Sequence, residues 1–480
     1  MNKFYITSAI PYVNAAPHIG HALEFLQTDI LARLARLENK DTIFLTGADE
    51  NSLKNVQAAQ AQNIPTQTLC DQNSLLFENL INKLNISVDI FQKASDKKHI
   101  EGSQLLWQLC DKSGDIYKRT YQGLYCVGCE AFYNKDELTE DGLCPEHLKK
   151  PELIKEENYF FRLSKYQSFL EDLIKNDKLK ITPEIRKNEV FAFIKKGLKD
   201  FSISRSAKRA HNWGIPVPND PDQVIYVWFD ALNIYQTGIG FGSDQAKYQK
   251  YHPADIHIIG KGISRFHAIF WPAILKSAGL KIPKNIFIHG YVTIEGQKMS
   301  KTLGNVINPT SLIEKYGVDS LRYYLAREIP TYQDGDFSQN RFIQLYNADL
   351  ANGLGNLIAR VASLCQKSNL DFPQSNDSYS LRDNLQKLIS QFKLNEAIST
   401  LWLDKNNSVT YLDRLINDQK PWRQQGKDLE KTLFQSVSII RHIAYNLQLF
   451  LPTTAQKILT QFKGSKIITS PPLFPRLDND

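Results

Sequence analysis

The first sixty residues alternate between short apolar runs and longer segments in which apolar residues recur three and four positions apart. Residues 3–9 (KFYITSA) and 41–51 (DTIFLTGADEN) have the composition of strands. Residues 22–37 (ALEFLQTDILARLARL) and 52–62 (SLKNVQAAQAQ) show the period of helices. This order predicts an α/β fold with a parallel sheet, in which ligands bind where the strands end.

The same pattern returns much later in the chain. Strand-like runs lie at 224–231 (VIYVWFDA), 255–262 (DIHIIGKG) and 286–293 (IFIHGYVT). Between about 115 and 215 cysteines, aromatic residues and charges crowd together, which indicates an inserted domain that splits the sheet in sequence. From about 350 the spacing is helical throughout.

Composition limits the classes of protein that fit this pattern. The chain has 480 residues, enough for about three domains, with 23% charged and 42% hydrophobic residues. Its net charge of +7 permits a polyanionic partner. No apolar run approaches the roughly 18 residues of a membrane span. Because the chain starts directly in a strand, we expect no signal peptide and a cytoplasmic location.

Two histidines mark the start of the first predicted helix. His18 and His21 lie in PYVNAAPHIGHA, so both fall on the first helical turn and share a face. Unpaired N–H groups at a helix start suit phosphate. Three interpretations are open on this stretch alone: a zinc pair lacking a third ligand, ordinary helix-start histidines, or donors aimed at a polyphosphate.

A second basic motif favours the polyphosphate. Residues 295–309 (EGQKMSKTLGNVINP) place Lys298 and Lys301 beside Ser300 on a loop flanked by glycines. Two ammonium groups on such a loop suit the migrating charge of a polyphosphate. A solvated basic turn is the simpler alternative. The pairing with the histidine motif, about 280 residues earlier, favours a nucleotide site.

The inserted region carries a cysteine motif with metal-ligand spacing. Cys126 and Cys129 form one pair, and Cys144 and His147 form a second pair. Fourteen residues separate Cys129 from Cys144. Two such pairs fit one tetrahedral zinc ion, and four protein ligands close its coordination shell. The pattern predicts a structural zinc knuckle. Cys70, Cys110 and Cys365 instead fall in helical surroundings and are expected to be buried thiols.

The motifs together resemble a known family. PHIGH and KMSKT resemble the two signature motifs of class I aminoacyl-tRNA synthetases. The narrower resemblance is to methionyl-tRNA synthetases, and it rests on these stretches: SAIPYVNAAPHIGHALE, FLTGADEN, VWFDALNIY, GKGISRFHAIFWPAIL, KMSKTLGNVINP and YNADLANGLGNLIARV.

The resemblance implies a two-step reaction. Methionine and ATP give methionyl-adenylate and pyrophosphate, and methionyl is then transferred to tRNA(Met), initiator and elongator, with Mg²⁺ carried by the ATP. It implies that catalysis rests on His18, His21, Lys298 and Lys301, and that the nucleotide also contacts Gly20, Gly260 and Ser300. No covalent nucleophile is needed, so the enzyme positions groups and stabilises charge.

The resemblance also implies a methionine pocket. Methionine is unbranched and polarizable, which suits an aromatic pocket with few polar groups. The matching positions are Ile10, Tyr12, Asp49, Trp228, Ala231, Leu232, Tyr235, Ile263, His267 and Trp271. Asp49 would bind the substrate ammonium, and Tyr12 and His267 would flank the thioether. The alternatives are core packing for both tryptophans and a helix-capping role for Asp49.

The helical C-terminal part resembles the anticodon-binding domain of the family. Asn356 and Arg360 lie one turn apart in NLIAR, and KPWRQQ presents Trp422. An exposed Trp can stack on an unstacked base whose edge Asn and Arg read. The alternatives are a core Trp422 and a salt-bridged Arg360.

The chain departs from the family pattern at a few positions. Gly262 stands where the family usually has an Asp suited to ribose hydroxyls, and Asn51 stands where many members have His. Thr302 replaces the usual Ser at the end of the second signature motif. The chain also stops at Asp480, before the dimerising domain of longer relatives, which favours a monomer.

The resulting domain prediction is as follows: a Rossmann-like catalytic domain in two halves (1–114 and 216–290), an inserted connective domain with the zinc knuckle (115–215), a KMSKS-loop and stem-contact region (291–349), and an all-α anticodon-binding domain (350–480). Two other functions are weighed against this one. A synthetase for another apolar amino acid would usually carry a larger editing insert, and a non-catalytic RNA-binding relative would be expected to lose the signature histidines or lysines.

Overall fold

The computed structural model describes residues 2–126, 131–133, 135–146, 148–299, 304–372 and 379–477. Only the backbone is described for Ala131, Phe132, Asp136 and Lys298. The chain forms two compact units. The first contains residues 1–17, 35–79 and 87–289, and the second contains residues 18–34, 80–86 and 290–480.

A six-stranded parallel sheet forms the centre of the first unit. Its order is β3-β2-β1-β12-β13-β7. The strands are β1 (Lys3–Ser8), β2 (Asp41–Ala48), β3 (Ile90–Lys93), β7 (Lys180–Thr182), β12 (Ile256–Gly260) and β13 (Asn285–His289). Because β1 pairs directly with β12, two stretches about 250 residues apart in sequence share one sheet, as the sequence predicted.

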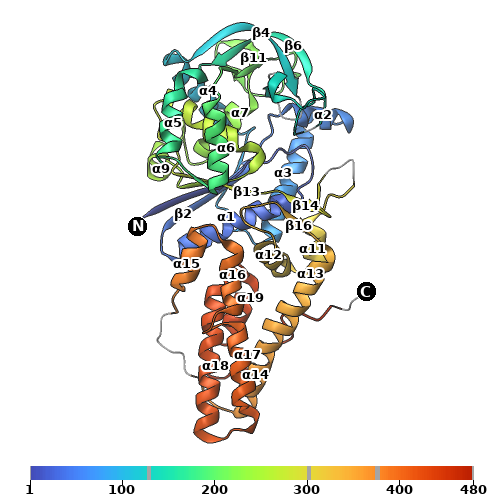
Figure 1. The fold of residues 1–480 in the computed structure, drawn as a ribbon, viewed down its shortest axis with the longest axis vertical. Coiled ribbons are helices and arrows are strands. Elements are labelled where there is room, and N and C mark those ends of the chain that lie inside the picture. Colours follow the sequence, from blue (N-terminus) through green and yellow to red (C-terminus); the bar gives the residue numbers. More distant parts are fainter. Residues whose placement is uncertain are drawn as a thin grey trace. The chain divides into compact units, whose positions relative to one another are not determined.

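Helices connect these strands along the chain (Figure 1). Their bounds are α1 (Ile19–Leu37), α2 (Leu53–Ala61), α3 (Thr66–Lys83), α4 (Lys97–Lys112), α5 (Gln167–Lys175), α6 (Glu184–Lys195), α8 (Ile234–Thr237), α9 (Gln245–Tyr251) and α10 (Trp271–Ser277). Ser52 caps α2 by accepting a hydrogen bond from the Lys54 amide at 3.1 Å. Asp49 is therefore not the cap of this helix, and that alternative is wrong.

The chain between β3 and β12 also forms two small antiparallel sheets, the second of which extends past the predicted end of the insert at residue 215. One has the order β5-β4-β6-β8 and the other β10-β11-β9. Their strands are β4 (Ile116–Cys126), β5 (Ala131–Tyr133), β6 (Glu152–Phe161), β8 (Phe201–Ser202), β9 (Ser204–Ser206), β10 (Pro216–Val217) and β11 (Asp220–Ile225). β7 lies within the predicted insert but pairs with β13, so that part of the chain belongs to the parallel sheet.

Two apolar runs differ from the prediction. The run 224–231 is not one strand, because β11 ends at Ile225 and α7 (Val227–Ala231) follows. The run 286–293 divides at Gly290 into β13 and β14 (Val292–Ile294). A side chain at Gly290 would meet the Gln333 carbonyl oxygen at 2.2 Å, so only glycine fits this close backbone approach.

The second unit is mainly helical (Figure 1). A small sheet of β14, β15 (Gln297–Lys298) and β16 (Gly335–Phe337) precedes most of its helices. The helices are α11 (Pro309–Tyr316), α12 (Val318–Arg327), α13 (Gln339–Leu345), α14 (Asn356–Ser368), α15 (Asp383–Ser390), α16 (Leu394–Leu403), α17 (Val409–Gln419), α18 (Gly426–Leu447) and α19 (Pro452–Gln461). Within the described residues, no helix combines the length and apolar composition that crossing a bilayer requires.

A buried guanidinium connects separate segments of the second unit. Arg322 on α12 is fully buried and donates to the Asp29 carboxylate of α1 at 2.7 Å. It also donates to the carbonyl oxygens of Leu84 at 3.0 Å and Phe450 at 2.6 Å. Because a buried charge needs such partners, this side chain fixes α1 to the helical part of the same unit.

Candidate active site

The start of α1 carries the two signature histidines. His18 directly precedes the helix and His21 lies in its first turn, with the imidazole rings stacked at 3.9 Å between centroids. The Ile19 amide donates to the Ile307 carbonyl at 3.1 Å, so this turn is tied to the segment that follows the lysine loop. Both histidines therefore belong to the second unit.

Backbone hydrogen bonds fix the tautomer of each histidine. The Gly20 amide donates to Nδ1 of His18, and the His18 amide donates to Nδ1 of His21, both at 3.1 Å. A nitrogen that accepts a hydrogen bond carries no proton, so the proton of each neutral ring is on Nε2. Burial lowers the pKa of His18 to about 4 and that of His21 well below its ordinary value. Each ring is thus a neutral Nε2–H donor at pH 7.

Gly20 is needed next to these rings. A Cβ at this position would lie 2.9 Å from Cε1 and 3.0 Å from Nδ1 of His18. Because His18 is held there by its own hydrogen bond, any side chain at position 20 would displace the imidazole. The family resemblance implies that Gly20 contacts the nucleotide. The structure shows a second reason for a glycine here, which is the close approach of the His18 ring.

The lysine loop is described only in part. β15 ends at Lys298, whose backbone pairs with Thr293 of β14. Ser300, Lys301 and Thr302 lie outside the described residues, as does the side chain of Lys298. The roles predicted for these residues stay predictions. Gly260 ends β12 at the carboxyl edge of the sheet, where the fold places ligands.

The predicted methionine pocket belongs entirely to the first unit. Tyr12 and Asp49 form a parallel bridge just beyond the ends of β1 and β2, with the Asp49 amide donating to the Pro11 carbonyl at 2.9 Å. The Lys54 ammonium lies 4.4 Å from the Tyr12 ring centroid. The structure thus brings together two residues that are 37 positions apart in the sequence and were both assigned to the substrate.

An aromatic wall adjoins this bridge. Trp228 contacts the Tyr12 ring edge-on at 6.1 Å and stacks on Phe266 at 3.8 Å with nearly parallel planes. Trp228 and Trp271 are both buried, as the core-packing alternative expects. The stacking geometry shows that Trp228 also orders the aromatic groups of the predicted pocket.

A hydrogen-bond chain fixes the polar end of the pocket. His267 lies in a π-helical turn (Phe266–Phe270), and its Nδ1 is 3.0 Å from the Ile263 carbonyl oxygen. Burial lowers the pKa of His267 to about 4, so the ring is neutral and Nδ1 carries its proton. Nε2 then accepts the hydrogen bond from the Tyr235 hydroxyl at 2.9 Å. The Tyr235 hydroxyl proton is thereby used within the protein, and its oxygen remains an acceptor.

The other predicted pocket residues lie on the same elements. Ala231 ends α7 and Leu232 follows it, both buried. Ile10 and Ile263 are partly buried and pack against the hydrophobic core of the first unit. All ten predicted residues thus belong to the first unit. Direct contacts within it join Tyr12 to Asp49 and Trp228, and His267 to Trp228 and Tyr235.

The zinc prediction falls partly outside the description. Cys126, at the end of β4, and Cys144 are both buried thiols of the first unit, which suits ligands of a structural metal. Cys129 and His147 lie outside the described residues. Among the residues that are described, no group of three or more His, Cys, Asp or Glu side chains is arranged to hold a metal ion. The zinc site stays a prediction.

The predicted anticodon residues all belong to the second unit. Asn356 is exposed at the start of α14. Arg360 pairs with Asp413 at 2.9 Å, as the salt-bridge alternative expected, and donates to Asn417 at 3.2 Å. Trp422 is 53% exposed in a 3₁₀ turn after α17, so the alternative of a core tryptophan is wrong.

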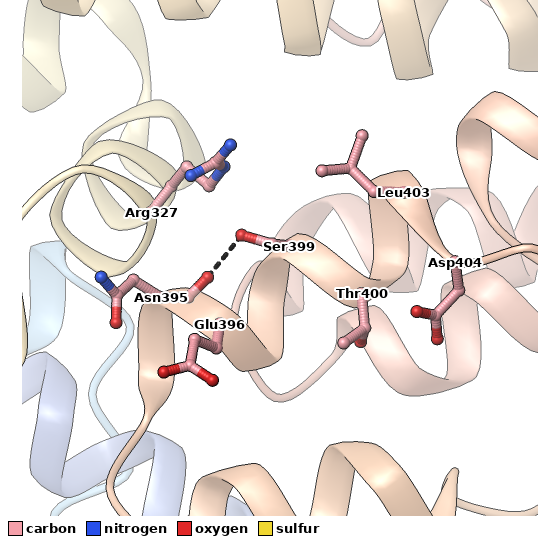
Figure 2. A pocket seen from close by; sticks show the side chains of 7 residues that line it. All are labelled: Arg327, Asn395, Glu396, Ser399, Thr400, Leu403 and Asp404. Carbon is pink, nitrogen blue, oxygen red and sulfur yellow. Dashed lines mark hydrogen bonds between the residues drawn. The ribbon is translucent and has the colours of Figure 1, made fainter.

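One cavity is lined by other residues. It has a volume of about 370 Å³ in the second unit, between the end of α12 and one face of α16 (Figure 2). Its lining is Arg327, Asn395, Glu396, Ser399, Thr400, Leu403 and Asp404. Figure 2 shows these side chains along α16 and beside Arg327, with a hydrogen bond from the Ser399 hydroxyl to the Asn395 carbonyl. It contains none of the predicted site residues.

Comparison with known proteins decides the family. The model of class I tRNA synthetases of the methionine type, "tRNA synthetases class I (M)", matches residues 4–150 and 143–362. The chain is 37% identical to the methionine–tRNA ligase of Thermotoga maritima over 99% of this chain and 80% of the relative. It is 41% identical to that of Brucella melitensis over 95% of this chain and 91% of the relative. The chain belongs to the methionyl-tRNA synthetase family.

A solved synthetase of the family has the same fold. The Mycobacterium tuberculosis methionyl-tRNA synthetase in complex with methionyl-adenylate matches with a TM-score of 0.92 and 37% identity, over 99% of this chain and 100% of that one. The family resemblance and the α/β fold with a parallel sheet are therefore confirmed.

Three residues beside those of the predicted pocket were missed from the sequence. Phe266 directly precedes the predicted pocket residue His267 in RFHAIFW, and this adjacency could have indicated that Phe266 lies near the pocket. His257 is a histidine inside the apolar run of β12, with its ring 4.5 Å from that of Tyr235. Asp230 lies inside VWFDA and accepts a hydrogen bond from Asn51, a contact that sequence spacing does not reveal.

Proposed function

We propose that this chain ligates L-methionine to tRNA(Met) in an ATP-dependent reaction that passes through methionyl-adenylate. The observation that carries the proposal is the match across nearly the whole chain to methionine–tRNA ligases at 37% and 41% identity. A structural relative holds methionyl-adenylate, the intermediate of that reaction. The reaction is therefore methionine activation followed by tRNA charging.

The chemistry balances without a covalent enzyme intermediate. A carboxylate oxygen of methionine attacks the α-phosphorus of ATP, and the bond to the β-phosphate oxygen breaks to release pyrophosphate. A ribose hydroxyl at the 3′ end of tRNA then attacks the carbonyl carbon, and AMP leaves. Both steps develop negative charge on phosphate oxygens, so the protein contributes positioning and charge stabilisation.

We assign the phosphate contacts to His18, His21, Lys298 and Lys301. The neutral Nε2–H groups of the histidines are donors that need no proton uptake at pH 7, which supports this role. The two ammonium groups meet the charge that grows on departing pyrophosphate. Gly20, Gly260 and Ser300 are assigned to the nucleotide as well. ATP carries Mg²⁺, whose chemistry is neutralisation of phosphate charge.

The pocket chemistry suits methionine. Asp49 supplies a carboxylate for the substrate ammonium, and the aromatic wall of Tyr12, Trp228 and Phe266 suits a soft, unbranched side chain. Since Tyr235 donates to His267, neither group is left as a strong donor toward the substrate side chain. A substrate side chain that must accept a hydrogen bond gains no donor from this pair, which suits a thioether.

The metal and tRNA assignments extend this proposal. Cys126, Cys129, Cys144 and His147 would hold a structural zinc ion that stabilises the inserted domain. Asn356, Arg360 and Trp422 would read the anticodon, and the exposure of Trp422 supports a stacking role. The five domain ranges expected from the sequence, a monomeric state, a cytoplasmic location and binding of both initiator and elongator tRNA stay predictions.

Exchange of radiolabelled pyrophosphate into ATP tests the proposal. We expect exchange with methionine and at most weak exchange with leucine, isoleucine and valine. Charging of a tRNA(Met) transcript should follow, with release of AMP. Exchange that depends on another amino acid would identify a different synthetase. The absence of exchange with all twenty amino acids would favour a non-catalytic RNA-binding relative.

A further inference from the structure

Asn51 joins two walls of the pocket that are far apart in the sequence. Its side-chain amide donates to the Asp230 carboxylate at 2.5 Å, across 179 positions of the chain. Asp230 is 1% exposed and lies in α7 between Trp228 and Ala231. The Asn51 backbone amide also donates to a carboxylate oxygen of Asp49 at 3.3 Å. One residue thus contacts both the carboxylate assigned to the ammonium and the helix that carries the aromatic wall.

The neighbouring histidine does not supply an equivalent donor. Nδ1 of His99 lies 2.8 Å from the Thr237 hydroxyl, which itself donates to the Asn233 carbonyl at 3.2 Å. With the Thr237 hydroxyl donating to Asn233, it accepts from Nδ1 of His99, and the Ser103 hydroxyl lies 3.3 Å from Nε2 as the donor to that nitrogen. Burial lowers the pKa of His99 to about 3, so the ring is neutral and Nε2 has no proton. That nitrogen is 4.0 Å from the Asp230 carboxylate, which is too far for a hydrogen bond, and it has no proton to donate.

From this geometry we propose that Asn51 is a positioning residue of the methionine site. Its amide N–H fixes α7, and with it Trp228, against the end of β2 that presents Asp49. The inference rests on the proposed function and adds a residue that the family pattern does not supply, since many members have His at this position. Position 51 requires a side chain whose nitrogen next to Cγ carries a hydrogen that it can donate to the Asp230 carboxylate.

A histidine can provide that donor from the same place. Nδ1 of His and Nδ2 of Asn are both bonded to Cγ, so an Nδ1–H group at position 51 would reach Asp230 in the same way. The extra ring atoms have room, because Asn51 borders a cavity of about 30 Å³ lined also by Tyr125, Trp213 and Val227. An aspartate has the size of asparagine but no N–H, and it would place a second carboxylate against Asp230.

The test measures steady-state pyrophosphate exchange in wild type, N51D, N51H and N51L. We expect N51D and N51L to raise the KM for methionine at least tenfold, with the KM for ATP within twofold of wild type. N51H should stay within threefold of wild type for both substrates. The matched control is N176D, which removes an amide–carboxylate bond of 2.7 Å to Asp172 on exposed α5 and should change neither KM.

The outcomes separate this inference from the proposed function. Wild type without methionine-dependent exchange would contradict the function itself. If the wild type is active, and N51D and N51L have the same KM values as the wild type, only the role of Asn51 is overturned. Equal loss in N51D, N51L and N51H, with equally lowered melting temperatures, would also overturn it by making the residue merely structural. If N51D does not fold, the comparison of N51H with N51L decides.

Discussion

Replacing Arg322 with methionine should destabilise the second unit strongly. The guanidinium is fully buried, and methionine fills much of its volume without its donors. Asp29, also fully buried, would lose its 2.7 Å partner but keep the 2.7 Å bond from Arg33. The carbonyl oxygens of Leu84 and Phe450 would lose donors as well.

The magnitude follows from these contacts. Breaking a buried ion pair by removing one partner costs about 3–5 kcal/mol. Arg33 remains to compensate Asp29, which favours the lower end of that range. Each lost hydrogen bond to a buried carbonyl adds about 1 kcal/mol. We therefore expect R322M to lower the free energy of unfolding by about 5 kcal/mol, which corresponds to a melting temperature lower by about 10–20 °C.

An exposed pair of similar geometry serves as the control. Arg341 donates to Glu328 at 2.8 and 3.3 Å, and its side chain is 46% exposed. Because solvent screens this pair, R341M should cost no more than about 1 kcal/mol. Urea titration of both variants measures the difference. If R322M costs less than 1 kcal/mol, or no more than R341M, the buried pair does not hold the unit together and the reasoning is wrong.

Four further predictions concern chemistry and pH. Metal analysis should find about one zinc per chain, and Cys126→Ser should release it and lower the melting temperature. Lys301→Ala should lower kcat for adenylate formation by an amount corresponding to about 2–4 kcal/mol, with little change in the KM for methionine, as pre-steady-state kinetics would show. Trp422→Ala should weaken tRNA charging by about 1–3 kcal/mol but leave pyrophosphate exchange and the melting temperature unchanged, because the side chain is 53% exposed. Burial lowers the pKa of His99 to about 3 and of His267 to about 4, so the unfolded state takes up protons first as the pH falls below about 6.5; urea titrations at pH 7.5 and 5.5 should show a loss of about 1.4 kcal/mol for each of these histidines.

Local patterns predicted the elements that repeat a simple period. The strands β1 and β2 and the helices α1 and α2 lie within a few residues of their expected bounds, because each shows its period over several turns or alternations. The split of the sheet was also predictable, since strand composition returned after the insert. The grouping of the pocket residues followed from the family resemblance.

Features that depend on distant contacts were not predictable in the same way. The run VIYVWFDA is apolar throughout, and such a run fits a strand or a buried helix equally well, so the helical turn that carries Trp228 was missed. β7 has three residues, too few to show a period, and only its pairing with β13 places it in the sheet. The bonds of Asn51 to Asp230 and of Arg322 to Asp29 span 179 and 293 positions, which no local pattern reports.

The π-helical turn at Phe266–Phe270 lets this stretch hold one extra residue without turning the flanking side chains away from each other. In an α-helix, residues four apart drift by about 40° around the axis, so Ile263, His267 and Trp271 would move steadily away from one face. A turn closed by hydrogen bonds five residues apart holds one residue more and offsets that drift. Removing a single residue such as Ala268 would restore an ordinary helix in which Ile263 and Trp271 are seven residues apart, so that their directions would differ by only about 20°. Removing two residues would instead turn one away from the other by about 120°. Related sequences should therefore accept the loss of one residue in this stretch far more readily than the loss of two.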